Sequence, residues 1–293
     1  MLEVNLNPSH LCRAHLLFTL TKEGRRTPFF LSHVSATRTL FLLCLLFFSL
    51  PLHAQTLRIA AAADLQFALP DLAAQYEKQT GVKLAVTYGS SGNFFAQIQN
   101  GAPFDLFLSA DMEYPRKLID AGLADSNFVQ VYATGFLVLW LPPDSPLDPA
   151  AGLKTLLDLR IQKIAIANPE HAPYGRAAVE AMRSAGLSDQ LKSKLVFGEN
   201  IAQTAQFVQS GSAQAGLIAL SLALSPALNS GKRWIVPTDL YSHIDQGLVL
   251  LKSSPNKHAA RSFLTFFYSP KARATLEHYG YSMPPPGSAE PKP

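Results

Sequence analysis

Four short stretches of small and hydroxyl-bearing residues follow apolar, strand-like segments and lead directly into helical patterns. A helix start carries unpaired N–H groups and a partial positive charge, so it attracts anions. Parallel strands bring such junctions to one edge of a sheet. We therefore expect them to converge on one anion: "AAAADL" (60–65), "GSSGNF" (89–94), "NPEHAPYGR" (168–176) and "GENIAQ" (198–203).

A simpler interpretation applies to each junction by itself. Ser, Asp and Asn are also the ordinary N-cap residues of helices, so a single junction is more often a cap than a ligand contact. The prediction therefore depends on the set of four. The set contains no Lys and one Arg, Arg176, which we expect to face solvent. Backbone N–H groups and hydroxyls would have to bind the anion.

Catalysis is not expected. Both cysteines, Cys12 and Cys44, lie near the N-terminus, and no Gly-x-Ser-x-Gly motif is present. The histidines after residue 54 are scattered, which argues against a nucleophile and base pair: His171, His243, His258 and His278.

A ferric-ion site is the main alternative to an anion site. Tyr279, Tyr281, Asp64 and His171 could in principle converge on such an ion. No second His stands at ligand spacing from His171, so we interpret that residue as part of a loop.

The N-terminal region has the features of a secretion signal. The apolar run "TLFLLCLLFFSLPL" (39–52) follows Arg25, Arg26 and Arg38, and it is too short to span a membrane. We expect cleavage between Ala54 and Gln55. Removing residues 1–54 takes away 5 of the 25 basic and 2 of the 21 acidic residues, which leaves 20 − 19 = +1. This charge does not suggest binding to nucleic acid.

The rest of the chain alternates short apolar strands with amphipathic helices, which is typical of an α/β fold. "TLRIAAAA" is predicted to be the first strand and "DLQFALPDLAAQYEKQTG" a helix kinked near Pro70. "VKLAVTYG" and "FDLFLSA" are predicted strands on either side of a helix at "NFFAQIQNG".

From about Leu57 to Tyr281 the chain resembles the periplasmic molybdate-binding proteins of ABC importers. The resemblance rests on "AAAADL", "YGSSGNFFAQIQNGAPFDLFLSAD", "ANPEHAPYG" and "HYGYSMP". It implies a type II periplasmic binding protein, an α/β fold of two lobes with the ligand cleft between them. We expect residues 1–54 to be a leader, residues 55–134 with 241–293 to form one lobe, and residues 135–240 the other.

The resemblance also implies a set of ligand contacts. Ser91 matches a serine that offers its hydroxyl and its backbone N–H, while Ile201 and Tyr174 match positions that offer backbone N–H groups. In the first loop Ala63 and Asp64 replace hydroxyl or amide residues, so backbone groups must contribute more there. Ala219 stands where some members have a tyrosine, for which Tyr174 is a possible substitute.

Asp64 requires a separate argument. At about 5 Å and a dielectric near 20, its charge would repel a dianion by roughly 6 to 7 kcal/mol. We therefore expect the carboxylate to turn away and cap the helix beginning at Leu65, or else to bind in its protonated form. Asp111 is likewise interpreted as a helix cap.

The resemblance implies a periplasmic monomer that captures molybdate, and also tungstate, for an ABC permease in the inner membrane. The metal would be bound as the intact oxyanion, with no direct protein ligand and no cofactor. Sulfate, phosphate and ferric ion are the alternative ligands.

Overall fold

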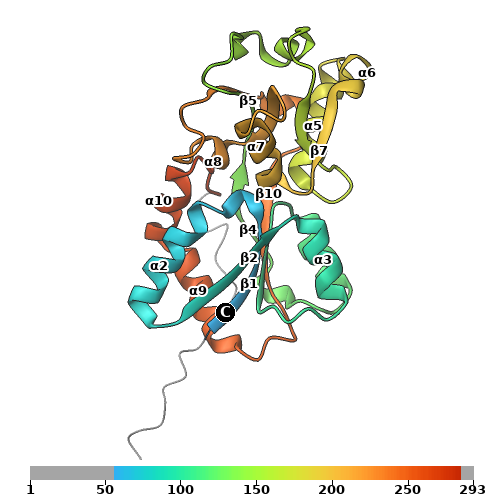
Figure 1. Cartoon of the computed structure of the whole chain (residues 1–293). Helices are drawn as coiled ribbons and strands as arrows, with labels where there is room; N and C mark the ends of the chain where they lie inside the picture. The colour runs from blue at the N-terminus through green and yellow to red at the C-terminus, as the bar shows by residue number, and fades with distance from the viewer. Residues whose placement is uncertain (1–55, 285–293) are drawn as a thin grey trace, which may run out of the picture. The chain divides into compact units, whose positions relative to one another are not determined.

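The computed structural model describes residues 56–284, all within one compact unit, His53–Pro293. Two five-stranded sheets organise this part of the chain (Figure 1). We call the part built on β1–β4 and β10 lobe 1, and the part built on β5–β9 lobe 2. The expected leader, with its cleavage site, lies outside the described residues.

The sheet of lobe 1 has the strand order β2-β1-β3-β10-β4. Strand β1 pairs in parallel with β2 and β3, whereas β10 is antiparallel to both β3 and β4. The strands are β1 (Thr56–Ala62), β2 (Lys83–Gly89), β3 (Leu106–Ser109), β4 (Gln130–Gly135) and β10 (Ile244–Leu250).

Two groups of helices cover the sheet of lobe 1. Helices α2, α9 and α10 form one apolar cluster with it, in which the rings of Tyr76 and Phe263 meet edge to face at 5.2 Å. Helices α3 and α4 form a second cluster around Phe94 and Phe107. The helices are α2 (Ala68–Thr80), α3 (Ser91–Gln99), α4 (Glu113–Asp120), α9 (Lys257–Phe267) and α10 (Pro270–His278).

The sheet of lobe 2 has the strand order β7-β6-β8-β5-β9. Its strands are β5 (Leu137–Leu141), β6 (Ile164–Ala167), β7 (Leu195–Gly198), β8 (Ala215–Ala219) and β9 (Lys232–Ile235). β5, β6 and β8 are buried along their whole length, which explains their continuous apolar sequences. The helices are α5 (Pro173–Ser184), α6 (Ser188–Leu191), α7 (Ile201–Gln209) and α8 (Leu220–Ala223).

Short 3₁₀ segments complete the connections: η1 (Ala63–Leu65), η2 (Ser126–Phe128), η3 (Pro149–Leu157), η4 (Lys192–Lys194) and η5 (Thr238–Leu240).

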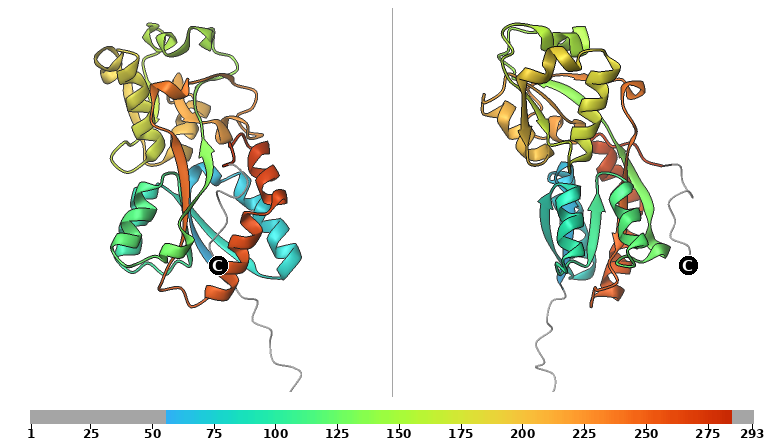
Figure 2. Two further views of the ribbon diagram at one scale, coloured as in Figure 1. Left: turned by 180° about the vertical axis from the view of Figure 1, so that it is seen from behind. Right: turned by 90° about the vertical axis from the view of Figure 1, so that its right-hand side faces the viewer.

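The chain crosses between the lobes twice. It leaves lobe 1 where β4 ends at Gly135 and β5 begins at Leu137, and it returns between β9 and β10. Figure 2, left, shows β10 in orange beside β4 in green at this crossing. The lobe limits expected from the resemblance stay a prediction.

The first predicted helix differs from the observed one. After β1 the chain forms the 3₁₀ turn η1, and α2 begins only at Ala68. Pro70 is therefore the third residue of α2, within the first turn, where its missing N–H breaks no intrahelical hydrogen bond. The helix ends as expected, at Gly81 in a left-handed conformation with φ of 72°.

Within residues 56–284, no helix combines the length and apolar character needed to cross a membrane.

Candidate anion-binding site

A small pocket lies where loops of lobe 1 meet the helix starts of lobe 2. The five positions expected to bind the ligand all line it. Its lining residues are Ala62, Ala63, Asp64, Gly89, Ser90, Ser91, Ala110, Ala172, Pro173, Tyr174 and Ile201. The structure thus brings the four junctions together, and their contacts with a ligand stay a prediction.

The two serines of "GSSG" have different roles, one as a helix cap and one as a possible hydroxyl donor to a ligand. Ser90 is the N-cap of α3, and its hydroxyl accepts the N–H of Asn93 at 3.4 Å. Ser91, the first helical residue, has its Oγ 2.9 Å from the Ala110 nitrogen, whose N–H it accepts. Since an Oγ that accepts keeps its own O–H free to donate, Ser91 can offer a hydroxyl proton to a ligand.

Ile201 and Tyr174 present backbone N–H groups from lobe 2. Ile201 is the first residue of α7, behind the cap Asn200, whose side chain accepts from Ala202 and Gln203 at 3.0 Å each. Tyr174 is the second residue of α5, after Pro173. An N–H in the first turn has no acceptor within its own helix, so these two are available to an anion.

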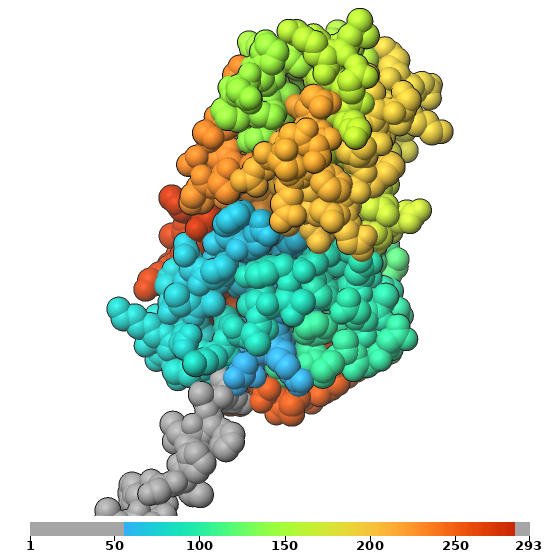
Figure 3. Space-filling model, viewed as in Figure 1, coloured from blue at the N-terminus to red at the C-terminus, as the bar shows by residue number. Residues whose placement is uncertain are grey.

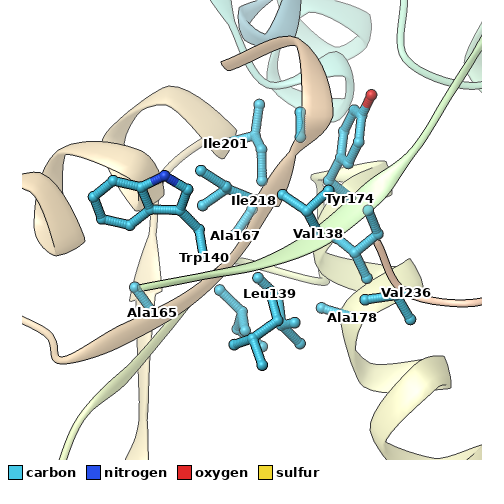
Figure 4. Close-up of a cluster of buried hydrophobic side chains, with 14 of the residues drawn as sticks. Val138, Leu139, Trp140, Ala165, Ala167, Tyr174, Ala178, Ile201, Ile218 and Val236 are labelled. Carbon is cyan, nitrogen blue, oxygen red and sulfur yellow. The ribbon is translucent and has the colours of Figure 1, made fainter. Parts of the chain in front are cut away.

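The Tyr174 side chain connects the lobe 2 core to lobe 1. Figure 4 shows its ring beside Val138 and Ile218, with the hydroxyl directed out of the apolar cluster. That hydroxyl donates to Asp64 Oδ2 at 3.2 Å. The interaction fixes Tyr174 against Asp64.

The expectation that Asp64 caps a helix is wrong. Asp64 lies inside η1, which has no side-chain cap, and its side chain is completely buried. Oδ2 accepts hydrogen bonds from Tyr174, from Gln246 Nε2 at 2.5 Å and from the Tyr281 hydroxyl at 3.0 Å. These donors lie far away in the chain, so the local sequence pattern did not reveal them.

Burial raises the pKa of Asp64, although hydrogen bonds from Gln246, Tyr281 and Tyr174 act in the opposite direction. Burial dominates because the surroundings supply neutral donors: among the residues that the structure describes, no Lys or Arg forms an ion pair with Asp64. The buried site therefore favours the neutral carboxylic acid.

The sequence interpretation missed three residues of this buried network, Tyr132, Ser221 and Gln246. Gln246 Oε1 accepts from the Tyr132 hydroxyl at 2.5 Å, which orients its amide nitrogen toward Asp64. Ser221 Oγ, from lobe 2, donates to the Asp64 backbone oxygen at 2.9 Å. The available signal was Gln246 itself, a polar residue next to the apolar run of β10, and its side chain is completely buried.

Further contacts hold the lobes together around the pocket. The Gly92 N–H donates to the His171 backbone oxygen at 2.9 Å, and His171 Nδ1 lies 3.0 Å from Ser90 Oγ. Asn93 of lobe 1 is hydrogen-bonded to Glu199 of lobe 2. In Figure 3 the gold surface of lobe 2 lies directly against the blue and cyan surface of lobe 1. The structure thus shows the lobes in contact.

Arg176 does not simply face solvent, which corrects the sequence expectation. Its guanidinium forms an ion pair with Asp111 and lies 3.6 Å from Glu113, so it connects α5 of lobe 2 to lobe 1. Asp111 also accepts the Tyr114 N–H at 3.1 Å, a contact with the first turn of α4, although Asp111 precedes the N-cap residue Met112.

The four residues considered for a ferric site do not converge. Tyr281 contacts Asp64, but the Tyr279 hydroxyl donates to Asp71 at 2.8 Å, and His171 lies in a turn beside Ser90 and Glu199. Within residues 56–284, no three His, Cys, Asp or Glu side chains are placed to hold a metal ion.

Comparison with known proteins identifies the family. Residues 57–282 match the model of the bacterial extracellular solute-binding proteins. The chain is 40% identical over 233 residues to a molybdate-binding protein of Azotobacter vinelandii, covering 78% of this chain and 91% of the relative. It is 38% identical over 234 residues to one of Rhodobacter capsulatus, covering 80% and 90%.

A solved structure of a periplasmic molybdate-binding protein from Azotobacter vinelandii superimposes with a TM-score of 0.74 at 36% identity. The match covers 78% of this chain and 99% of that one. It confirms the expected two-lobed α/β fold of a periplasmic binding protein. The chain therefore belongs to the bacterial extracellular solute-binding proteins.

Proposed function

We propose that this protein captures molybdate, and also tungstate, in the periplasm and delivers it to an ABC permease. The relatives with the same fold are molybdate-binding proteins, and they match over most of their length. The proposal includes export as a monomer, cleavage near Gln55 and no catalytic activity. The intact mass of protein recovered from the periplasm tests the cleavage position.

The observation that carries the proposal is the convergence of Ala63, Asp64, Ser91, Tyr174 and Ile201 on one pocket. None of the described residues that line this pocket is Lys or Arg. Helix-start N–H groups and the Ser91 hydroxyl are the groups that solvate a fully ionised oxyanion without a cationic side chain. Metal-ligand bonds are not needed for such binding.

The donors come from both lobes, which explains how a ligand would affect closure. Ser91 belongs to lobe 1, whereas Tyr174 and Ile201 start helices of lobe 2. An anion held between them interacts fully with the closed arrangement only, so binding shifts the population toward closure. Selection between anions would then depend on size, since the donors are fixed on two rigid lobes.

Hydrogen phosphate is a second candidate because of the position of Asp64. A protonated phosphate requires an acceptor, and the sequence analysis expected the Asp64 carboxylate to turn away from the ligand. The structure instead places Asp64 in the pocket lining. Similarity to the molybdate-binding relatives favours molybdate, and direct competition between the anions decides.

Thermal unfolding with single anions tests the assignment. A ligand specific for the native state stabilises it by about 4 kcal/mol at a thousandfold excess over Kd. At about 2 to 4 °C per kcal/mol, molybdate and tungstate should each raise the melting temperature by roughly 8 to 16 °C. Sulfate should have little effect because it is too small to reach donors on both lobes.

Phosphate provides the discriminating comparison. A shift from phosphate equal to that from molybdate would reject the molybdate assignment. A coloured, iron-loaded protein that shows no shift with any of the anions would instead support the ferric alternative.

A further inference from the structure

One oxygen of the buried Asp64 carboxyl has no partner. Oδ2 accepts from Tyr174, Gln246 and Tyr281, whereas Oδ1 is buried without a hydrogen-bond partner among the residues that the structure describes. Asp64 also lines the anion pocket. A buried polar atom without a partner is costly, so Oδ1 is the carboxyl atom available to a bound ligand.

The groups around Asp64 are neutral donors. Burial raises the pKa of Tyr132, Tyr174 and Tyr281, so all three keep their protons at neutral pH. Their hydroxyl groups can therefore donate hydrogen bonds without adding charge.

The elements packed on η1 add no compensating cation. Helices α7 and α8 contain no titratable residue. Strand β2 contributes Tyr88, whose pKa burial raises to about 12, and Lys83 at its opposite end. In α2, which follows η1, Asp71 is hydrogen-bonded to Tyr279.

Ionisable groups near the pocket already have partners. His171 Nε2 lies 3.8 Å from Glu199, and Arg176 is paired with Asp111 and Glu113.

We propose, as a deepening of the oxyanion-binding function on which it rests, that Asp64 is protonated when molybdate is bound and donates its proton from Oδ1 to an anion oxygen. An ionised Asp64 would place two like charges in one pocket, and Oδ1 would have no proton to donate. The neutral acid removes the repulsion and supplies the missing hydrogen bond. Burial, which raises the pKa of Asp64, acts in the same direction.

The proton balance makes Asp64 a determinant of specificity. One proton lies between Oδ1 and the nearest ligand oxygen. Molybdate is unprotonated at neutral pH, so this proton must come from Asp64 or be taken up from solvent on binding. Hydrogen phosphate brings its own proton and would bind the ionised carboxylate. The protonation state of Asp64 in the loaded protein therefore indicates whether the site is suited to molybdate or to hydrogen phosphate.

Infrared spectroscopy of the molybdate-loaded exported protein, with the wild-type spectrum compared with those of variants, tests the proposal. We expect the carbonyl band of a protonated carboxylic acid in the wild type and its loss in Asp64→Asn. The matched control, Asp111→Asn, removes the other described aspartate whose pKa burial raises and should keep the band. Tyr281→Phe, which removes a donor to Oδ2, should shift the band without abolishing it.

Calorimetry on the same proteins distinguishes failure of the Asp64 inference from failure of the proposed molybdate-binding function. Asn keeps an N–H donor for the ligand, so Asp64→Asn should bind molybdate within about tenfold of the wild-type affinity at about pH 6, a change of about 1.4 kcal/mol or less. Molybdate binding without the carboxylic-acid band in the loaded wild type overturns this inference alone. A wild type that binds no molybdate overturns the proposed function itself.

Discussion

The Ser91 hydroxyl oxygen accepts the backbone N–H of Ala110 at 2.9 Å, so β3 and its following turn hold the first residue of α3 in place. The contact positions Ser91 against the pocket and leaves its proton as a donor. Because Ser90 is the cap of α3, loss of the Ser91 hydroxyl should affect binding more than helix stability.

Replacing Ser91 with Ala should weaken molybdate binding. The loss of one hydrogen bond to a buried anion costs roughly 1.5 to 3 kcal/mol, or about ten- to a hundredfold in affinity. Calorimetric titration measures the effect. Ser269→Ala is a matched control, since Ser269 caps α10 away from the pocket, accepting the Ala272 N–H at 3.3 Å. Equal affinities for both variants would show that Ser91 does not contact the ligand.

Gly92→Ala should hinder closure of the lobes. An added Cβ would lie 2.7 Å from His171 Cβ and 2.8 Å from the His171 backbone oxygen, both in the opposite lobe. It would also lie 2.5 Å from the Tyr114 hydroxyl, the mobile end of a side chain in the same lobe. We expect affinity to fall by at least about tenfold, about 1.4 kcal/mol.

The melting temperature of unliganded Gly92→Ala distinguishes an effect on lobe closure from a loss of folding stability. A parting of the lobes relieves the contact with His171, so the unliganded protein should melt within a few degrees of the wild type. A large loss of stability without ligand, with unchanged affinity, would contradict the closure argument.

Arg176→Gln should reduce affinity in a salt-dependent way. The variant loses the interlobe ion pair with Asp111 and Glu113, which stabilises only the closed arrangement. Since the pair is partly exposed, the loss should be about two- to tenfold at low salt and smaller at high salt. Lys117→Gln is the control: Lys117 pairs with Glu113 within α4 at 2.5 Å and does not connect the lobes. Similar losses in both variants would point to a general charge effect.

Asp64→Asn should change how stability depends on pH. The folded protein raises the pKa of Asp64 above its ordinary 3.8. At pH values between 3.8 and the raised pKa, the folded state retains a proton that the unfolded state releases. Wild-type stability therefore falls as pH rises through this window, by up to about 1.4 kcal/mol per pH unit.

Asn does not titrate, so the stability of the variant relative to wild type should increase with pH across that window. Urea unfolding of the unliganded proteins at several pH values measures this difference. A difference that stays constant from acidic to neutral pH would show that Asp64 has an ordinary pKa in the folded protein.

The four junctions that line the pocket were predictable because strand-to-helix junctions depend on local pattern. Strand-to-helix junctions are visible in the sequence, and the carboxyl ends of parallel strands meet at one sheet edge. The junctions were located in this way, although the structure distributes them over two sheets. The individual positions Ser91, Tyr174 and Ile201 came from the resemblance to the molybdate-binding proteins. The alternation of strands and helices likewise predicted the α/β class.

The surroundings of Asp64 were not predictable in the same way. Its donors Tyr174, Gln246 and Tyr281 are 110, 182 and 217 residues distant in the sequence. The local sequence allowed only two effects to be compared, helix capping by the Asp64 carboxylate and its repulsion of the ligand. The structure instead buries the Asp64 side chain. Strands β4 and β9 also escaped prediction, since their sequences, "QVYATG" and "KRWI", lack a long apolar run.

The position of β10 determines which parts of the molecule depend on late segments of the chain for folding. All five strands of lobe 2 lie between Leu137 and Ile235, so that sheet can form from this continuous stretch alone. Lobe 1 needs β10 between β3 and β4, and also the two last helices. Until those late residues arrive, β3 has an open edge and the Asp64 carboxyl lacks Gln246 and Tyr281. A chain without these residues therefore has no finished pocket, and lobe 1 cannot be completed before the end of the chain is available.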